Sequence, residues 1–582
     1  MRRPPTPCTA AIRAVHQYRC RDVVPYLALR YYLTARSARR ERWAADVAVS
    51  LVLQRTSSPY LAVKHFKERC PDGTIRLRDI FLPCANEALA EAALLAECAK
   101  HESFANPSQV FSYALAVGAE TNGAFRPYFQ GLQRRHLMVA AACRSHPHSV
   151  VRYCDIRAFY ASIPASIAAD AWRRACERAL LPGVLSSLGR CLLDSHRAFG
   201  ARDGSAVLTG PMFSHLVGNL VLRELDLAMS KESGVTYARY VDDIILVGSP
   251  AAVDQAHAEV CRLLQEIGLA LHPAGSGKDL SVSGREWLAG EHDFDDSDRP
   301  VQWKRLVGPL KWLLVSAPEQ HSTVYWAMRR AGFRMPIADY TGAIRDAGYL
   351  NRLGTLVRLR WLRGRQRGVG DLIRDARVLR DRYLRESDLL LAQVQEARGY
   401  RRKRVVPKLR YRAGRLAYLA APNQLAQLAE RLRLVPELAL HAAVLLAIAT
   451  RDVTDVVCLG TSAAQAVGQA LHAEGHGATL RGPLTCQHQA QGLAVLALNG
   501  VPVSGGEVDR SAFGRDELLQ LARGGATPEL MRSADPFIRE FASLHGLTTR
   551  PRHADTLDTA FDEAEDAAFD ATSQLVASAS GC

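Results

Sequence analysis

The chain has 582 residues, of which 48% are hydrophobic and 23% are charged, proportions that are typical of a globular protein and exclude a disordered, collagenous or small disulfide-stapled chain. This length predicts three or four domains. The net charge is +15, and 20 Lys and Arg against 6 Asp and Glu between Arg352 and Arg415 account for +14 of it, so one segment rather than the whole surface is suited to a polyanion.

The cysteine pattern and the hydropathy both indicate a cytoplasmic protein. Thirteen cysteines are scattered along the chain with no CxxC pair, which argues against a disulfide framework and for a reducing compartment. The basic N-terminus is interrupted by prolines, and no apolar signal-peptide core follows it. The most apolar run, residues 434–449, contains Glu437 and His441 and is shorter than the roughly 18–20 residues of a membrane span. We therefore expect no contact with a membrane.

The first half of the chain predicts a mixture of helices and strands. Residues 11–55 have helical spacing, residues 57–83 predict strands and a Pro-Asp-Gly turn, and residues 86–100 predict an Ala-rich helix. The elements expected next are a buried strand at 149–156, a helix at 214–229, two strands at 235–240 and 244–248, and an amphipathic helix at 251–271.

The second half predicts mainly helices. Long Leu-, Arg- and Ala-rich helices are expected from about residue 303 to residue 450, whereas the Gly-containing stretch 451–545 has no pattern that assigns it. After about residue 550 the chain is acidic and rich in Ala and Ser, which is typical of a mobile tail or a terminal helix.

Three aspartates form the most informative chemical pattern. Asp242 and Asp243 lie between two apolar strands, and two adjacent carboxylates at a tight hairpin are unfavourable to bury without a cation. Asp155 follows an apolar strand and is expected at its end, facing the pair. Three carboxylates so placed suit Mg²⁺ and two-metal phosphoryl transfer. For the Asp pair alone, the alternative is an ordinary solvated turn.

Five segments, in order, resemble the motifs of reverse transcriptases. They are Asp155–Ile163 (DIRAFYASI), Thr209–Ser214 (TGPMFS) with Asn219 beyond it, Tyr240–Asp243 (YVDD), Ile267–Leu269 followed by Lys278, and Trp287–Gly290 (WLAG), which resembles the primer-grip turn. The resemblance covers about residues 55–295. It implies an α+β right-hand polymerase with fingers, palm and thumb, and an all-helical C-terminal extension.

Motifs and composition together divide the chain into five expected parts. These are an N-terminal helical segment (1–55), fingers and palm (56–300), a basic thumb-like helical region (301–420), a C-terminal helical or mixed domain (421–550) and an acidic tail (551–582).

The resemblance also implies roles for single residues. Asp155, Asp242 and Asp243, with the carbonyl of Ile156, would hold two Mg²⁺ ions, for which Mn²⁺ is a substitute. Tyr160 occupies the position of the sugar gate, where a bulky ring collides with a ribose 2′-hydroxyl and favours deoxynucleotides. The alternative for Tyr160 is an ordinary core aromatic.

Further residues would contact the nucleotide or the template. Gly210 and Ser214 would shape the surface against the template base pair, where small residues allow close approach. Arg76 or Arg78 resembles the fingers arginine that grips the incoming triphosphate bidentately, and Lys278 would approach the pyrophosphate as a proton donor. The alternatives are solvated strand charges for the arginines and a surface lysine for Lys278.

The basic segment lies in and beyond the position of the thumb, with aromatic residues interleaved. Clustered cations neutralise phosphates and aromatics stack on bases, so we expect nucleic-acid contact from Arg401, Arg402, Lys403 and Arg404. The alternative is a solvated Arg-rich helix face.

The Gly-Pro-x-x-Ser form of the second motif resembles defence-associated, abortive-infection bacterial reverse transcriptases. The function expected is therefore an RNA-directed DNA polymerase of antiphage defence, with an RNA template that is either general or a dedicated non-coding RNA, dNTPs as substrates and DNA as product. A homo-oligomer or a companion defence protein remains open. The alternatives are a template-independent or protein-primed DNA polymerase of the same family, an RNA-dependent RNA polymerase, and a catalytically silent scaffold.

Overall fold

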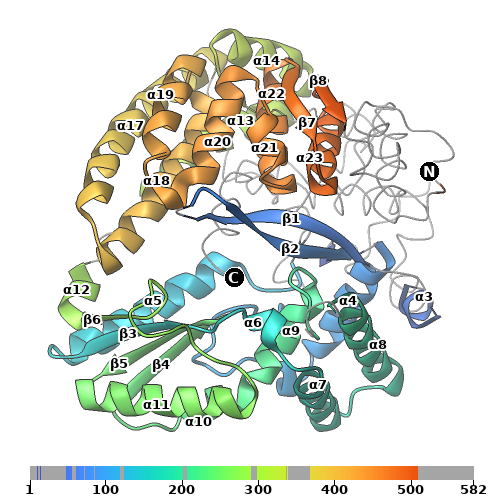
Figure 1. Cartoon of the computed structure of the whole chain (residues 1–582), viewed down its shortest axis with the longest axis vertical. Helices are drawn as coiled ribbons and strands as arrows, with labels where there is room; N and C mark the ends of the chain where they lie inside the picture. The colour runs from blue at the N-terminus through green and yellow to red at the C-terminus, as the bar shows by residue number, and fades with distance from the viewer. Residues whose placement is uncertain are drawn as a thin grey trace.

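The computed structural model describes residues 10, 13, 14, 17, 48–54, 60–70, 72–83, 85–117, 123–200, 206–289, 298–335, 337, 368–508 and 532. Most of the expected N-terminal segment, all of the acidic tail, and six arginines of the basic segment lie outside these residues. Within them the protein is a mixture of helices and strands (Figure 1). No helix of the described part is long and apolar enough to cross a membrane.

A four-stranded antiparallel sheet organises the first half of the chain. Its order is β4 (Val235–Tyr240), β5 (Asp243–Gly248), β3 (Val150–Asp155) and β6 (Leu280–Ser283). These strands confirm the buried strand and the hairpin that were predicted from the apolar runs. Because β3 and β5 are antiparallel, the end of β3 lies beside the start of β5.

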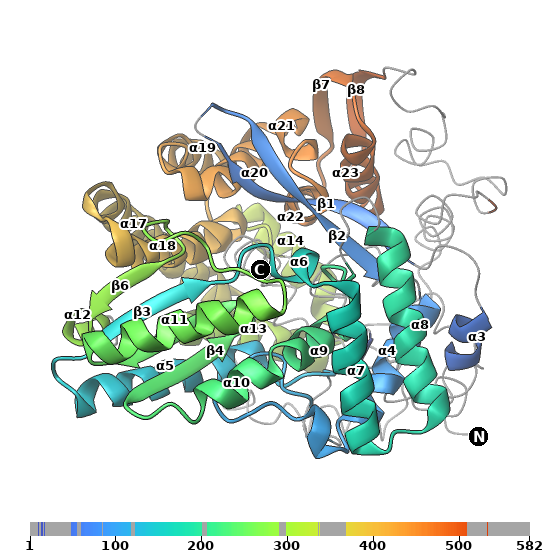
Figure 2. The same cartoon turned by 60° about the horizontal axis from the view of Figure 1, so that its bottom comes forward.

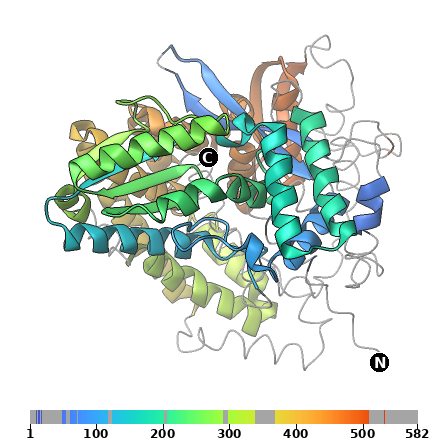
Figure 3. The same ribbon diagram turned by 90° about the horizontal axis from the view of Figure 1, so that it is seen from below.

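Alternate side chains of β5 enter two different cores, as the period of two in a strand requires. Ile244 and Leu246 pack in one core with helix α11 (Pro250–Glu266), which lies across the near face of the sheet in Figures 2 and 3. Ile245 and Val247 pack in the other with helix α5 (Tyr128–Ser145). Asp243 has the same parity as Ile245 and so belongs to the α5 face.

Helices beside the sheet complete the first of these cores. Helix α9 (Met212–Val221) is buried along its whole length, as expected of a helix in which most residues are apolar. The helices and 3₁₀ turn of this half, besides α5 and α11, are α3 (Val49–Gln54), α4 (Ala85–Cys98), η2 (Glu102–Phe104), α6 (Phe159–Ser162), α7 (Ala165–Ala179), α8 (Gly183–Gly200), α9 (Met212–Val221), α10 (Arg223–Met229) and α12 (Gly284–Ala289).

The prediction of a turn at Trp287–Gly290 is wrong for Trp287 to Ala289, because these three residues lie in helix α12. The sequence before them explains the helix: the Ser283 hydroxyl accepts a hydrogen bond from the backbone N–H of Glu286 at 3.1 Å, which is the geometry of a helix N-cap.

The hairpin predicted between residues 57 and 83 is present as β1 (Tyr60–Arg69) and β2 (Ile75–Pro83). It crosses the molecule between the sheet and the C-terminal helices (Figure 1). Its apolar residues share one hydrophobic core with those helices, and they are Leu61, Val63, Phe66, Ile80 and Leu82.

Gly460 allows the C-terminal helices to approach β1 closely. It precedes helix α22 (Thr461–Glu474) with a φ of 96°, and a Cβ there would lie 2.0 Å from the carbonyl oxygen of Lys64. The side chain of Gln491 also donates to the Ala62 carbonyl at 3.2 Å. The hairpin that we assigned to the fingers is therefore packed on the C-terminal helices.

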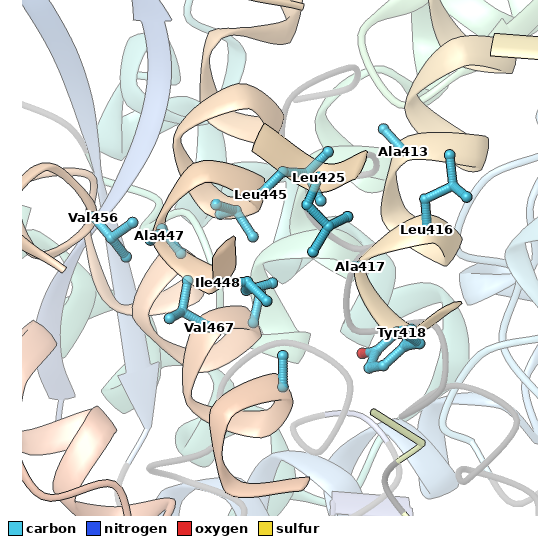
Figure 4. Packing of buried hydrophobic residues seen from close by; sticks show 14 of the residues in the cluster. Ala413, Leu416, Ala417, Tyr418, Leu425, Leu445, Ala447, Ile448, Val456 and Val467 are labelled. Carbon is cyan, nitrogen blue, oxygen red and sulfur yellow. The ribbon is translucent and has the colours of Figure 1, made fainter. Parts of the chain in front are cut away.

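One continuous core runs through the C-terminal helices, across the boundary expected at residue 420 (Figure 4). Its helices and 3₁₀ turns are α13 (Asp298–Ser316), η4 (Pro318–Gln320), α14 (His321–Arg330), α17 (Val369–Glu396), α18 (Gly399–Leu419), α19 (Pro422–Leu432), η6 (Pro436–Leu438), α20 (Ala439–Thr450), α21 (Thr454–Val457), α22 (Thr461–Glu474) and α23 (Gln487–Leu498). We call this part, together with the strands described next, the C-terminal lobe.

The expectation of an all-helical C-terminal extension is wrong. Strands β7 (Ala478–Leu484) and β8 (Val503–Val508) pair in parallel, with α23 as the connection between them. A parallel pair needs such a crossover. The region lacked a recognisable pattern because its strands are short and contain Gly and Pro, which interrupt the alternation that identifies a strand.

Candidate active site

Three aspartates meet at one edge of the four-stranded sheet. Asp155 ends β3 and is paired in register with Asp243, which begins β5. The backbone N–H of Ile156 donates to the carbonyl of Asp242 at 3.0 Å. The structure thus brings together Asp155, Ile156, Asp242 and Asp243, which were predicted from the sequence as one site.

The turn between β4 and β5 is strained. Tyr240 pairs with Asp243, so Val241 and Asp242 form a two-residue connection, and Val241 has a φ of 58°. A β-branched residue in this left-handed region is an uncommon outlier. The Val241 N–H donates to the hydroxyl of buried Ser112 at 2.8 Å, and its carbonyl accepts from Arg239 at 2.8 Å. Both backbone groups of the strained residue are therefore held.

A buried ion pair lies behind this turn. Arg239 and Asp226 are both fully buried and form a bidentate pair, with N–O distances of 2.8 and 2.7 Å. Tyr237 donates to the same carboxylate at 2.7 Å, and Arg239 also donates to the side chain of Asn219 at 3.2 Å. Arg239 and Asp226 were not predicted as site residues, although an arginine inside the otherwise apolar strand VTYARY indicates a buried partner.

The electrostatics of the three carboxylates differ. Asp242 is 5% exposed, and burial, together with the charges of Asp243 and Asp155, raises its pKa above the ordinary value. Burial also raises the pKa of Asp243, although Arg135 and the hydroxyl of Tyr153 oppose the shift. Tyr153 donates a hydrogen bond to Asp243, and Arg135 lies 3.7 Å from its other oxygen.

Asp155 is held by the ammonium of Lys278 and also lies beside His272. The ammonium of Lys278 lies 2.5 Å from one carboxylate oxygen, and His272 lies 3.5 Å from the other. Burial lowers the pKa of Lys278, but the hydrogen bond and charge of Asp155 outweigh it, so the pKa is raised overall. Lys278 is therefore a charged partner of Asp155, rather than an isolated surface lysine.

The carboxylate oxygens of this site are suitable ligands for a divalent cation, but the side chains are not arranged to coordinate one. Among the described residues, no group of three or more His, Cys, Asp and Glu side chains is arranged to hold a metal ion. The reason is that Asp155 faces Lys278 while Asp243 faces Tyr153 and Arg135. Asp155, Asp242 and Asp243 nevertheless lie at adjacent strand ends, and carboxylate oxygens are the ligands that Mg²⁺ and Mn²⁺ prefer. Mg²⁺ binding would require Asp155 to give up its contact with Lys278, whereas Asp243 can keep the hydrogen bond from Tyr153 on one oxygen and present its other oxygen to the ion.

Tyr160 lies near this site but is in the core. Its side chain is 4% exposed, and its hydroxyl is 2.6 Å from Nδ1 of His215. His215 in turn stacks on Tyr113, with ring centroids 3.7 Å apart. The bulky ring is present at the expected position, and its outer end is held by a buried histidine that the sequence analysis did not single out.

Gly210 is required where the hairpin β1–β2 meets the part of the chain that carries the four-stranded sheet, residues 85–289, which we call the sheet half. Its φ is 130°, and a Cβ there would lie 2.3 Å from the carbonyl oxygen of Phe81. The Phe81 N–H donates to the Thr209 carbonyl at 2.8 Å, which closes this approach. Ser214 is fully buried in α9, so its predicted contact with a template would be indirect.

The two hairpin arginines lie in different surroundings. Arg76 is exposed and forms an ion pair with Glu68 at 3.2 Å. Arg78 is half-buried, opposite His65 in the β1–β2 register. Their predicted triphosphate contact remains a prediction.

The run from Arg401 to Arg404 begins helix α18, and its members have different environments. Arg401 is exposed. Arg402 forms a bidentate pair with Glu437 at 2.6 and 2.8 Å, and Arg404 donates to the Ala289 carbonyl at 3.1 Å. Lys403 lies over the ring of Tyr153, 4.1 Å from its centroid. Three of the four predicted nucleic-acid ligands therefore have partners within the protein.

Comparisons with known proteins found no match by sequence and a distant similarity by structure. No protein-family model matches the chain, and no curated protein matches it. Among solved structures, the chain is similar to an apo telomerase from Candida tropicalis, with a TM-score of 0.26 and 8% identity, over 40% of this chain and 46% of that one. The match thus spans less than half of that chain, and a similarity at this level carries no argument about fold or function.

Proposed function

We propose that the protein is an RNA-directed DNA polymerase that extends a 3′ end with dNTPs. The observation that carries this proposal is the convergence of Asp155, Asp242 and Asp243 at adjacent strand ends, on a strained turn held by Arg239. A turn held in a sparsely populated conformation is typical of functional sites. The ordered sequence motifs supply the reaction class.

The residues of the chain would divide the work as follows. The three aspartates would hold Mg²⁺, which when bound would activate the attacking hydroxyl and stabilise the leaving pyrophosphate. Lys278 would exchange its hydrogen bond to Asp155 for the negative charge of the triphosphate. The ring of Tyr160, braced by His215, would limit space at the sugar and favour deoxynucleotides. A role in antiphage defence is part of this proposal and is supported by the form of the Gly210 motif alone.

The test is nucleotide incorporation on a primed RNA template with Mg²⁺. We expect Asp242→Asn/Asp243→Asn to lose activity, because loss of metal-mediated stabilisation is worth several kcal/mol, which corresponds to about a thousandfold or more in rate. Asp254→Asn is the matched control, since Asp254 is 76% exposed on α11, and it should retain wild-type activity. Equal incorporation by the double variant and the wild type would refute the proposal. Preference for rNTPs would redirect it to an RNA polymerase.

A further inference from the structure

One lysine of the C-terminal lobe, Lys403, lies beside the carboxylate site. Lys403 lies on α18, far along the chain from β3, yet its ammonium is 4.1 Å from the ring centroid of Tyr153. The same Tyr153 donates its hydroxyl to Asp243. A cation, an aromatic ring and a candidate metal ligand thus form a continuous chain of contacts between the lobe and the sheet.

The start of α18 is fixed in place on both sides of Lys403. Tyr400 stacks on Trp287 of α12, with centroids 5.0 Å apart and ring planes 17° from parallel. Arg404 donates to the last residue of the same helix, and Arg402 is paired with Glu437 of the lobe. Lys403 is consequently held between two parts of the protein and differs from an ordinary mobile surface lysine.

The surroundings of Lys403 give its charge an effect on Tyr153. The side chain is half-buried, and burial lowers its pKa, with Lys278 adding to the effect and the carboxylates of Asp243 and Asp155 opposing it. A cation over an aromatic face is attracted by the negative face of the ring, and in a partly desolvated place this attraction restricts the ring. A restricted ring keeps its hydroxyl directed at Asp243.

We propose that Lys403 is a positioning residue, which the C-terminal lobe supplies to hold Tyr153 against Asp243. The inference builds on the proposed function, since it treats Asp243 as a residue of the active site. It goes beyond that function because it makes the activity of the sheet conditional on the docking of α18. The chain of contacts runs from the lobe, through Lys403 and Tyr153, to the carboxylate.

A double-mutant cycle on nucleotide incorporation tests the inference. Lys403→Met and Tyr153→Phe should each lower kcat about 5- to 20-fold, with KM for dNTP changed less than about twofold, because Lys403 acts on a carboxylate rather than on the nucleotide. If both act through one hydrogen bond, Lys403→Met/Tyr153→Phe should be no worse than either single variant. Lys403→Arg should retain most of the activity, and Lys100→Met, which removes an exposed lysine paired with Glu97, should be neutral.

Two results would overturn the inference: additive losses in the double variant, or a raised KM at unchanged kcat. Hydrogen exchange of the peptide that spans residues 240–244 supplies a readout without substrate. Lys403→Met should accelerate exchange there and leave β7 and β8 unchanged. If the wild type incorporates no nucleotide, the proposed function fails, whereas faster exchange in the variant would still support positioning by Lys403. Unchanged exchange would contradict it, and thermal unfolding identifies any variant that fails to fold.

Discussion

Replacing Asp242 by Asn should stabilise the metal-free protein at neutral pH while weakening its response to Mg²⁺. The cause is the crowding of Asp242 with Asp243 and Asp155 in a buried place, which raises its pKa. The folded protein therefore binds this proton more tightly than the unfolded chain does. Stability from this group is present at low pH and is lost as the pH rises from the ordinary carboxyl range toward the raised pKa. Asparagine has nearly the same shape and no such dependence.

The size of the effect follows from the linkage between protonation and folding. Each pH unit between the two pKa values removes about 1.4 kcal/mol of unfolding free energy, so two units correspond to about 3 kcal/mol. For a cooperative unit of about 400 residues, an unfolding entropy of roughly 2 cal/mol/K per residue makes 1 kcal/mol correspond to about 1 °C in Tm. The advantage of Asp242→Asn over the wild type in a chelator should therefore grow by several degrees between about pH 5 and about pH 7.5.

Thermal unfolding with and without Mg²⁺ measures both parts of this prediction. At about pH 7.5, Mg²⁺ in excess over its Kd should raise the Tm of the wild type, and it should raise the Tm of Asp242→Asn by less. Asp254→Asn controls for the loss of one negative charge at an exposed position. If Asp242→Asn were less stable than the wild type in chelator at neutral pH, or if its advantage were the same at both pH values, the electrostatic reasoning would be wrong.

Two further variants test how the turn and the hairpin are held. Gly210→Ala should lower the unfolding free energy by more than about 1 kcal/mol, because φ is positive and the Phe81 carbonyl leaves no space. Gly183→Ala, where no atom lies within 4 Å of the added Cβ, should be neutral or stabilising in the same denaturant titration. Similar losses at both positions would count against the steric argument. Arg239→Met should lower the unfolding free energy by about 3–5 kcal/mol, because it leaves Asp226 buried without its partner. Arg173→Met, which breaks an exposed ion pair, should change it by less than about 1 kcal/mol, and an equally small effect of Arg239→Met would show that Asp226 is solvated.

The parts of the site that sequence could predict are those encoded by short stretches. The apolar runs on either side of Asp242 and Asp243 identify a hairpin, and the apolar run before Asp155 identifies a strand, because alternation and apolar content are local properties. Asp155 was expected at a strand end that faces the pair, and the structure explains this placement by the antiparallel pairing of β3 with β5.

The parts that sequence could not predict depend on contacts between distant segments. Nothing near Lys403 indicates that it meets Tyr153, and nothing near Tyr160 indicates that His215 takes its hydroxyl. The charge count from Arg352 to Arg415 was also misleading about exposure. Arg410, Arg412 and Arg415 are buried in the described structure, where ion pairs, backbone carbonyls and aromatic faces surround them, so these three charges serve the interior of the lobe.

The shared core between hairpin β1–β2 and the C-terminal lobe has a consequence for how this protein can be divided. Leu61, Val63 and Phe66 have their apolar partners in helices that begin more than two hundred residues later. A chain cut near residue 300 would retain every sequence motif and expose this face of the hairpin to water, which favours aggregation. The lobe and the sheet half are thus one folding unit, and neither can be gained, lost or exchanged as a separate module.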